Sequence, residues 1–593
     1  MRVADYVIAE LARAGAQHVF TVAGGGSVFL CHALAHTPGI RYVCTHHEQA
    51  AAMAAEGYAR AGDRLGAVVV TSGPGGTNAI TGVVGAWTDH VPMIVLSGQS
   101  FLKQTIAGRG VRTLGVQELN IVDVVRPITK YAVMVTTPRS IRYHMERALY
   151  EAQSGRPGPC WLDIPADIQN AQIEPYQLEG FTPQPEPGLT SALRESVARV
   201  LAGLRAAKRP LLHVGHGIRI ARAQDMMREL VEMAGLPVVT ARNGNDLIES
   251  DHPLYVGRPG TFAQRGANFA VQTCNFYLAI GTRLCLAQTG YNSQDYARNA
   301  RIVQVDVDRA ELDKGTLKLA QTVQADAGVF LAELLRQAED GAGWPDWSEW
   351  SNRCAAWRRR YPAVLEEQRA QGKYLNSYAL VHLLSDLCTK DDVIVTDVGF
   401  AYQCVNQAWR IKMGQRLISN GGTAAMGWGL PAAIGAAFAT GRRVICIVGD
   451  GGLMMNVQEL ATLAHHGLPV KLVVLNNGGY LTMRQSQAHA FGEHMGSDEA
   501  GGLSFPDFST LARANRLPYH VLRNSRDSHN LLPLAIDGTG PAFIEVMMDP
   551  MQEQIPKSIN RRLPDGTIKQ TTIEDAYPYL PAEELAENMR IDK

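Results

Sequence analysis

At 593 residues, the chain is too long for a single hydrophobic core, and a prior of roughly 150 residues per domain predicts three or four domains. The formal net charge of −1 gives no electrostatic reason to expect nucleic acid or a membrane surface as a partner. The nine cysteines include no CxxC pair, so neither a zinc site nor a disulfide framework is indicated, and we expect a cytoplasmic protein.

The N-terminal stretch MRVADYVIAELARAG predicts an amphipathic helix. It lacks the continuous apolar segment of a signal peptide. Nowhere do 18 apolar residues run without interruption, so no transmembrane helix is expected.

Two breaks in composition divide the chain. Residues 173–190 contain four prolines and predict an extended linker, and a second break lies in DGAGWPDWSEW and the charged residues that follow it. We therefore expect domains at residues 1–172, 190–340 and 375–548, and a polar C-terminal tail at residues 549–593.

The first and third domains share the same order and spacing of predicted elements. In each, a helix of small residues leads to an apolar strand, a second helix and a second apolar strand. The spacing from Val68 to Pro92 matches that from Val444 to Pro469 within one residue. This match favours a duplicated α/β unit, although doubly wound folds in general share this order and spacing.

The middle domain places a glycine, an aspartate or an arginine directly after each of several apolar strands. The segments are LLHVGHGI, VVTARNGND, YLAIGTRLCL and RIVQVDVDRAEL. Since the carboxyl ends of parallel strands meet at one sheet edge, this pattern suits a nucleotide. A domain that retains the fold without its nucleotide would give the same pattern.

The segment GDGGLMMNVQELATLAHHGLPVKLVVLNN predicts a βαβ unit. An apolar strand at 444–448 precedes it, residues 453–466 have helical periodicity, and 470–475 predict the second strand. Asp450 and Asn477 would then lie at the same sheet edge, and their oxygens suit Mg²⁺ together with phosphate. The alternative is that both occupy ordinary turns, where these residue types are common.

Taken in order, HEQ at 47–49, TSGPGGTN at 71–78, and GDG separated from NN by 24 residues resemble thiamine diphosphate (ThDP) enzymes. The resemblance is closest to the acetolactate synthase-like family and covers nearly the whole chain. It implies an α/β fold of three doubly wound parallel-sheet domains: pyrimidine-binding, central FAD-type nucleotide-binding, and diphosphate-binding. It also implies a homodimer or homotetramer, in which one ThDP contacts the first domain of one chain and the third domain of another.

The resemblance implies three cofactors. Mg²⁺ would be held by Asp450, Asn477 and the backbone carbonyl of Gly479. The implied ThDP-binding residues are Gly25, Gly399, Met426, Gly449, Asp450, Gly451, Gly452, Asn477 and Gly479. Met426 would fold the cofactor into its V shape, although an isolated methionine more often fills a core. A structural FAD without a redox role would contact Arg156, Gly215, Gly217, Gly281, Arg283 and Asp306.

Glu48 and Gln117 are the candidate catalytic residues. In the family, the glutamate promotes the imino tautomer of the pyrimidine ring, which takes the proton from thiazolium C2. The small or apolar flank from Ala50 to Ala55 suits acid–base work by a carboxylate. Taken alone, a glutamate at a helix start is more often a cap that stabilises the dipole. Gln117 would donate to a developing oxyanion.

Four departures from the synthases fall around the implied substrate pocket. Phe400 and Ala401 replace Gln-His, Val116 replaces Phe, Ser486 replaces Trp, and Ala287 replaces the arginine that would hold an acceptor carboxylate. The acceptor pocket is expected to contain Val116, Ala287, Thr482 and Ser486, to be wide, and to lack that cation.

These departures predict a carboligase that decarboxylates pyruvate and transfers the two-carbon unit to a bulky uncharged acceptor. A ketone or a keto-deoxysugar nucleotide would serve, as in YerE-type carboligases. The alternatives are an acetolactate synthase catalytic subunit, a keto-acid decarboxylase or oxidase, and a non-catalytic paralogue. Retention of Glu48, Asp450 and Asn477 argues against the last.

Overall fold

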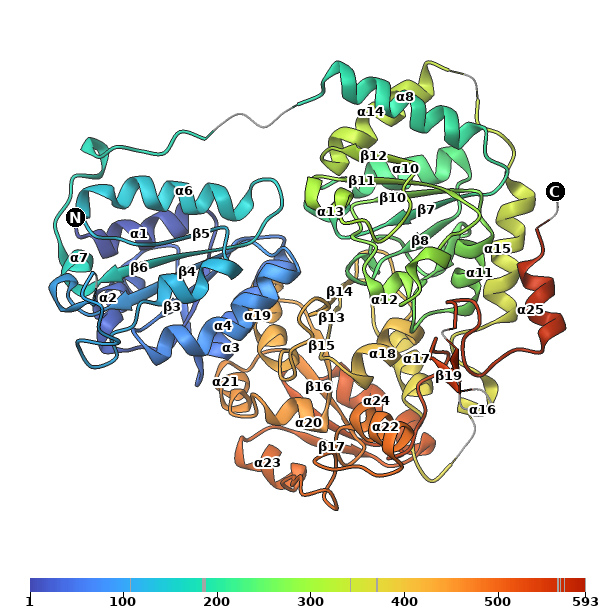
Figure 1. Cartoon of the computed structure of the whole chain (residues 1–593). Coiled ribbons are helices and arrows are strands. Elements are labelled where there is room, and N and C mark those ends of the chain that lie inside the picture. Colours follow the sequence, from blue (N-terminus) through green and yellow to red (C-terminus); the bar gives the residue numbers. More distant parts are fainter. Residues whose placement is uncertain are drawn as a thin grey trace.

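The computed structural model describes residues 1–593 except 107, 184–187, 342, 370–371, 563–564, 566, 570 and 592–593. The described residues form three α/β domains, each built on a parallel sheet of six strands. In Figure 1 the domains are three lobes: the N-terminal lobe in blue, the middle lobe in green and the C-terminal lobe in orange. The predicted fold class is confirmed.

The N-terminal sheet has the strand order β2-β1-β3-β4-β6-β5. Its strands are β1 (His18–Thr21), β2 (Arg41–Cys44), β3 (Gly66–Val70), β4 (Met93–Gln99), β5 (Tyr131–Met134) and β6 (Pro159–Pro165). Its helices are α1 (Val3–Arg13), α2 (Val28–His36), α3 (Glu48–Gly62), α4 (Pro74–Thr88), α5 (Ile121–Val125), α6 (Ile141–Gln153) and α7 (Ala166–Asn170). Every residue of β3 and β4 is buried, as their apolar composition predicts.

The middle sheet has the order β12-β11-β10-β7-β8-β9. Its strands are β7 (Pro210–Val214), β8 (Val238–Thr240), β9 (Tyr255–Gly257), β10 (Phe276–Ile280), β11 (Arg301–Asp306) and β12 (Gln321–Gln324). The helices are α8 (Ser191–Arg205), α9 (Gly217–Ile220), α10 (Gln224–Ala234), α11 (Arg265–Thr273), α12 (Leu286–Thr289), α13 (Arg309–Asp313), α14 (Ala327–Glu339), and then α15 (Ser348–Arg360) and α16 (Glu366–Arg369). Numbered from β7, this is the order 3-2-1-4-5-6 of dinucleotide-binding folds.

The C-terminal sheet has the order β14-β13-β15-β16-β18-β17. Its strands are β13 (Val393–Thr396), β14 (Arg416–Ser419), β15 (Val444–Gly449), β16 (Val470–Asn476), β17 (Tyr519–Leu522) and β18 (Ala542–Met547). Its helices are α17 (Ser377–Leu387), α18 (Phe400–Ala408), α19 (Gly429–Thr440), α20 (Asp450–Met454), α21 (Glu459–His466), α22 (Leu481–Phe491), α23 (Phe508–Ala514) and α24 (Ser525–Asp537).

The crossover between β15 and β16 differs from the single helix that its periodicity predicts. It forms two helices, α20 and α21, separated by a turn at Met455–Gln458. The side-chain amide of Asn456 donates to the carbonyl oxygen of Gly427 at 2.9 Å, so a tertiary contact competes with continued helix. Numbered within their own domains, the N- and C-terminal sheets share the order 2-1-3-4-6-5, which supports a duplicated unit.

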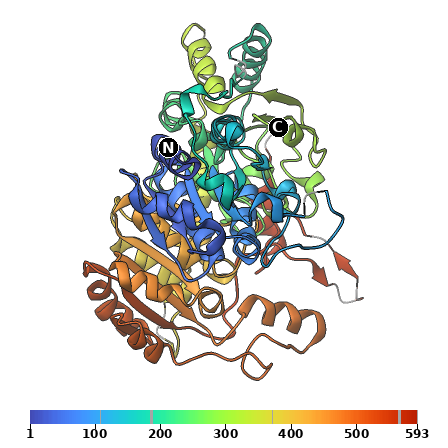
Figure 2. The ribbon, with the colours of Figure 1, turned by 90° about the vertical axis from the view of Figure 1, so that its left-hand side faces the viewer.

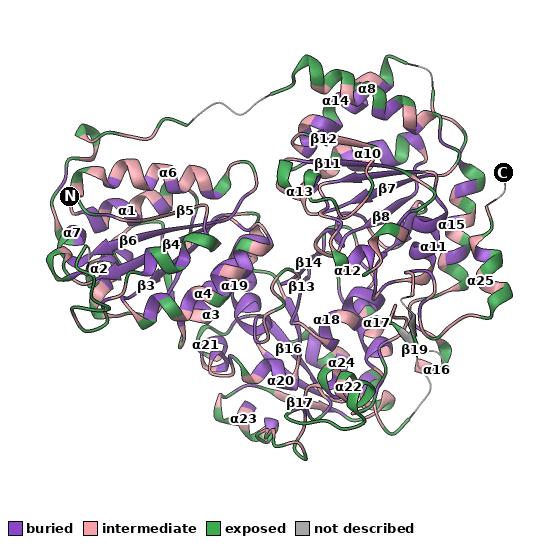
Figure 3. Ribbon diagram, viewed as in Figure 1, coloured by how far each residue is buried: buried purple, intermediate pink, exposed green. Residues whose placement is uncertain are grey.

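The N- and C-terminal domains meet through α3 and α19. Both helices are rich in alanine and glycine, and α3 is buried from Ala50 to Ala61. A side chain at Gly57 would collide with the backbone of Ala432, and one at Gly435 with the backbone of Ala54. The small residues therefore let the two helix backbones touch (Figure 1). Figure 2 shows the molecule with the blue N-terminal domain facing the viewer, and in Figure 3 both helices are largely purple.

The C-terminal tail returns to the middle domain. It contains the short antiparallel strands β19 (Arg561–Arg562) and β20 (Ile568–Lys569) and the helix α25 (Ala582–Met589). Trp357 of α15 donates its indole N–H to the Asn588 side-chain oxygen at 2.9 Å. Among the described residues, we find no helix with the length and apolar character needed to cross a membrane.

Candidate functional site

A cleft in the C-terminal domain opens where β13, β15 and β16 end. It is lined by residues 398–401, Met426, 449–452, Leu475, Asn477 and 479–483. It brings together most of the residues that the sequence assigns to ThDP and Mg²⁺: Gly399, Met426, Gly449, Asp450, Gly451, Gly452, Asn477 and Gly479. Thr482 of the expected acceptor set lines the same cleft.

Asp450 is held by backbone donors. One carboxylate oxygen accepts from Gly451 N at 2.7 Å, and the other accepts from Asn477 N at 3.0 Å and Gly479 N at 2.9 Å. Burial raises the pKa of Asp450 to about 6, while these N–H donors act to lower it. A carboxylate fixed in this way between two loops is a suitable hard ligand for Mg²⁺, which needs few protein ligands when it also binds phosphate.

Asn477 has a buried cationic neighbour that sequence reasoning missed. The Arg484 guanidinium, on α22, donates to the backbone oxygen of Asn477 at 3.1 Å and to its side-chain oxygen at 3.2 Å. Arg484 also lies 3.4 Å from the Asp498 carboxylate, which balances its charge. The guanidinium therefore fixes the orientation of the Asn477 amide.

Gly451 gives the cleft its shape, because a Cβ at this position would collide with the ring of Tyr480. Among the described residues there is no cluster of three or more His, Cys, Asp or Glu side chains that could hold a metal. One carboxylate, one amide oxygen and one backbone carbonyl do fit an Mg²⁺ that also binds a diphosphate. The cleft thus accepts the cofactors that the sequence implies.

Glu48 begins α3 at the edge of the N-terminal sheet. It is 9% exposed, and its carboxylate accepts from the side-chain amide of Asn78 at 2.9 Å. Gly25 lies in the loop after β1 at the same edge. Glu48 is not among the residues that line the C-terminal cleft of its own chain.

Gln117 lies in an exposed loop with a left-handed backbone, φ 61°. A Cβ on Gly73 would approach the Gln117 carbonyl oxygen to 2.7 Å, so the loop rests directly on the turn after β3. The next residue, Glu118, anchors the loop by accepting from the backbone N–H of Ile106 at 3.0 Å and of Leu114 at 3.1 Å.

A larger cleft lies at the carboxyl edge of the middle sheet. It is lined by the predicted FAD residues Arg156, Gly217, Gly281, Arg283 and Asp306. Gly215, the remaining member of that set, follows β7, and its N–H donates to Ile280 O at 3.0 Å. The cleft lies at the crevice between β7 and β10 where the strand order reverses, and dinucleotides bind at such crevices.

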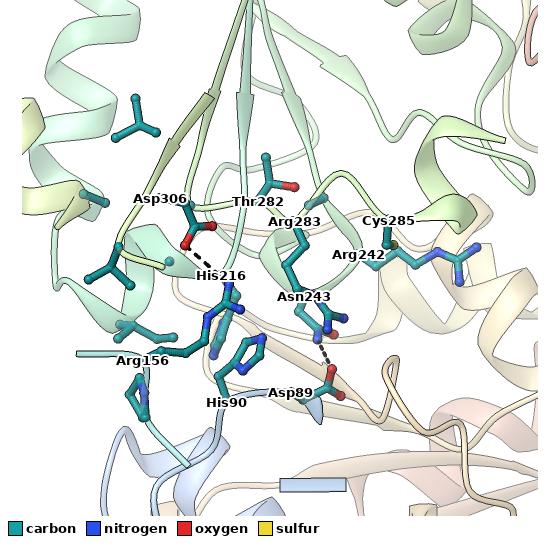
Figure 4. A pocket seen from close by; sticks show the side chains of 18 of the residues that line it. Asp89, His90, Arg156, His216, Arg242, Asn243, Thr282, Arg283, Cys285 and Asp306 are labelled. Carbon is teal, nitrogen blue, oxygen red and sulfur yellow. Dashed lines mark hydrogen bonds and ion pairs between the residues drawn. The ribbon is translucent and has the colours of Figure 1, made fainter. Parts of the chain in front are cut away.

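The middle cleft is lined by residues of all three domains, because Gly421 of the C-terminal domain also lines it. Asp89, His90 and Arg156 come from the N-terminal domain and face middle-domain side chains (Figure 4). Arg156 lies 3.4 Å from Asp306, and Asn243 donates to Asp89 at 3.0 Å. Burial raises the pKa of Asp306, whereas the charge of Arg156 opposes the shift.

Polar atoms in this cleft are buried without a hydrogen-bond partner among the described residues. They are His90 Nε2, His216 Nδ1 and Asn243 Oδ1. Burial lowers the pKa of His90 to about 2 and that of His216 to about 3, so both rings are neutral and each has one nitrogen that can accept. A polar dinucleotide would satisfy these atoms, so the cleft fits FAD.

The expected acceptor residues do not share one cleft. Thr482 lines the C-terminal cleft, Ser486 is exposed on α22, and Val116 is 91% exposed on the loop of Gln117. Ala287 lines the middle cleft instead. Within one chain, the four residues do not form the single pocket expected from the sequence.

Comparison with known families matches each domain. Residues 1–122 match the thiamine pyrophosphate enzyme N-terminal TPP-binding domain, 197–334 its central domain, and 397–546 its C-terminal TPP-binding domain. With the three sheets, these matches define the class as the thiamine pyrophosphate enzymes. The predicted ThDP-dependent enzyme class is confirmed.

Similar proteins narrow the class. The acetolactate synthase large subunit of Parasynechococcus marenigrum is 35% identical over 551 residues, covering 90% of this chain and 86% of that protein. Acetolactate synthase 1 of Oryza sativa is 33% identical over 570 residues, covering 93% and 85%. Acetolactate synthase isozyme 1 large subunit of Escherichia coli is 32% identical over 556 residues, covering 93% and 95%. The chain belongs to the acetolactate synthase large-subunit family.

Proposed function

We propose that this protein decarboxylates pyruvate and joins the two-carbon unit to a second 2-oxo acid. With pyruvate as acceptor, two pyruvate anions and one proton give one 2-acetolactate anion and one CO₂. The observation that carries the proposal is the C-terminal cleft, which gathers Asp450, Asn477, Gly479 and Met426. The names of the similar proteins favour acetolactate over other products.

In this proposal, Asp450, Asn477 and the Gly479 carbonyl would hold Mg²⁺, which would offset the negative charge of the cofactor diphosphate. When bound, ThDP supplies the carbon nucleophile that carries the two-carbon unit. Glu48 moves the proton that activates it, from a buried position where water competes poorly. Gln117 donates to the developing oxyanion.

We further propose that two chains build each active site. Glu48 does not line the C-terminal cleft of its own chain, which supports a site in which the N-terminal domain of a second chain supplies it. A homodimer is the minimum unit, and a homotetramer contains it twice. The limits 1–172, 190–340 and 375–548 remain our proposed domain boundaries, with 549–593 as the tail.

FAD is proposed as a structural cofactor of the middle cleft. The strand order and the unpartnered polar atoms of His90, His216 and Asn243 support it. A purified protein that carries FAD will be yellow, and reduction of the flavin will leave the carboligation products unchanged. A colourless, fully active preparation would instead show a nucleotide fold without its nucleotide.

A second candidate is transfer to a bulky uncharged carbonyl, such as a ketone or keto-deoxysugar nucleotide. Ala287 favours it, because alanine cannot pair with a carboxylate as arginine does. Product analysis with pyruvate alone, then with pyruvate plus a cyclic ketone, separates the candidates. Acetolactate without a tertiary alcohol supports our main proposal, whereas a tertiary alcohol as main product supports the second. No CO₂ from pyruvate with ThDP and Mg²⁺ would refute both.

A further inference from the structure

Arg258 carries a buried positive charge without a balancing carboxylate. It follows β9, is 2% exposed, and forms no ion pair within the part of the chain that the structure describes. Its Nη1 donates to Asn406 O at 2.8 Å and to Val405 O at 3.5 Å, at the end of α18. Such a charge is costly unless something pairs with it.

The opposite edge of the same guanidinium has no partner. Nε and Nη2 are buried and without a hydrogen-bond acceptor among the described residues. These two nitrogens present parallel N–H donors, which is the fork that binds a carboxylate through both its oxygens. Because Nη1 is fixed on α18, the fork has a fixed direction.

A second unpartnered donor lies near Arg258. Tyr402 is on α18, one helical turn before Asn406, and its hydroxyl is also buried without a partner among the described residues. The guanidinium of Arg258 donates to the carbonyl oxygen of Asn406 at 2.8 Å, one helical turn after Tyr402 on the same helix. The guanidinium of a second arginine, Arg242, lies 5.3 Å from the centre of the Tyr402 ring.

Arg258 and Tyr402 are not themselves among the residues that line either cleft, but the segments next to them line both. Phe400 and Ala401, at the start of α18, line the C-terminal cleft, whereas Arg242 lines the middle cleft. The loop of Arg258 also reaches Ala287: the N–H of Thr261 donates to Ala287 O at 3.0 Å. The unpaired guanidinium of Arg258 therefore lies in the loop that contacts Ala287, where the sequence predicts the loss of an arginine.

We propose that the Nε–Nη2 edge of Arg258, assisted by the Tyr402 hydroxyl, binds the carboxylate of the acceptor 2-oxo acid. The inference rests on the proposed function and names its specificity residue. The cation missing at Ala287 is then supplied from the neighbouring loop. The acceptor site is thus selective for a charged acceptor, contrary to what Ala287 predicts alone.

The test compares two acceptors that differ only in the carboxylate. Full-length protein with ThDP, Mg²⁺ and saturating pyruvate is offered 2-oxobutanoate and propanal together, and the two ligation products are quantified by mass spectrometry. The variants are Arg258→Met, which removes the charge, and Arg258→Lys, which retains it in a smaller donor. Arg358→Met is the matched control, because Arg358 also donates to carbonyls, those of Ser250, His252 and Tyr255.

In Arg258→Met the ratio of charged to neutral product falls about ten- to a hundredfold, as expected for one charge-assisted hydrogen-bonded contact. CO₂ release from pyruvate is measured in the same reactions, so that a loss of turnover is distinguished from a loss of selectivity. Arg258→Lys recovers part of the ratio, and Arg358→Met leaves it unchanged.

An unchanged ratio in both Arg258 variants, with CO₂ release retained, refutes the proposed carboxylate-binding role of Arg258. The proposed function is then unaffected. A loss of bound FAD with an unchanged ratio also refutes the proposed role of Arg258, since the guanidinium would then serve the nucleotide. If Arg258→Met does not fold, the ratio in Arg258→Lys decides. If wild-type protein releases no CO₂ from pyruvate, both the proposed function and the proposed role of Arg258 are refuted.

Discussion

Glu56 offers the sharpest test of the buried charges between the domains. It is fully buried on α3 and shares Arg60 with Asp89: Arg60 Nη1 lies 3.2 Å from a carboxylate oxygen of each. The other Glu56 oxygen accepts from the Trp428 indole at 2.7 Å and from Asn420 at 3.3 Å. Two carboxylates therefore compete for one guanidinium.

Burial raises the pKa of Glu56 from 4.5 to about 7, with the positive charge of Arg60 opposing the shift. The folded state therefore retains a proton that the unfolded chain releases. Stability from this group is fully present below pH 4.5 and is lost as the pH rises through 7. The difference corresponds to about 3 kcal/mol.

Glu56→Gln should remove this pH dependence. The glutamine oxygen can still accept from Trp428, but the glutamine does not titrate. The stability of the variant relative to the wild type should therefore increase as the pH rises from 4.5 to 8. Melting temperatures measured across this range should diverge by roughly 6–12 °C, given about 2–4 °C per kcal/mol for domains of 150–250 residues.

The matched control is Glu333→Gln. The ion pair of Glu333 with Arg336 lowers the pKa of Glu333 to about 2, so this carboxylate does not titrate in the same range. Parallel melting curves for Glu56→Gln and wild type at every pH would refute the charge competition. A Glu56→Gln variant that loses stability relative to the wild type as the pH rises would also refute it.

The remaining predictions concern the cofactors. Glu48→Gln should slow exchange of the thiazolium C2 proton of bound ThDP about 10²–10⁴-fold, measured by NMR after exchange in D₂O and an acid quench, and an unchanged rate would assign activation to another residue. Asp450→Ala should weaken ThDP binding at saturating Mg²⁺ in titration calorimetry, and wild-type affinity in excess chelator would remove the metal assignment. Asp306→Ala should lose bound FAD, read from the absorbance of the purified protein, while ThDP affinity stays within a few fold; retained flavin would place the nucleotide elsewhere.

The local sequence pattern predicts the buried strands and the residues that meet in the C-terminal cleft. Continuous apolar runs predict β3, β4, β15 and β16, because strands buried on both faces exclude polar side chains. The two ends of a βαβ unit must meet at one edge, so Asp450 and Asn477 are paired by topology alone. That is why the C-terminal cleft contains the residues that the motifs indicate.

Features that depend on tertiary packing were not predictable in this way. The break between α20 and α21 depends on Asn456 reaching Gly427, which is distant in sequence. Ala287 and Thr482, which the sequence assigns to one acceptor pocket, line different clefts of the same chain, because α12 belongs to the middle domain and α22 to the C-terminal domain. Arg258 is one arginine among many in the sequence, and only its burial and its unpartnered edge distinguish it.

The contact between α3 and α19 also has a consequence for synthesis. Gly57 packs against Ala432, and about 375 residues separate the two along the chain. At about 5–20 residues per second, a ribosome needs on the order of 20–75 s to make that stretch. For this time the alanine-rich face of α3 has no partner from its own chain, and an exposed apolar helix favours aggregation. A nascent N-terminal domain of this protein should therefore need a chaperone, and fragments that stop before α19 should be poorly soluble on their own.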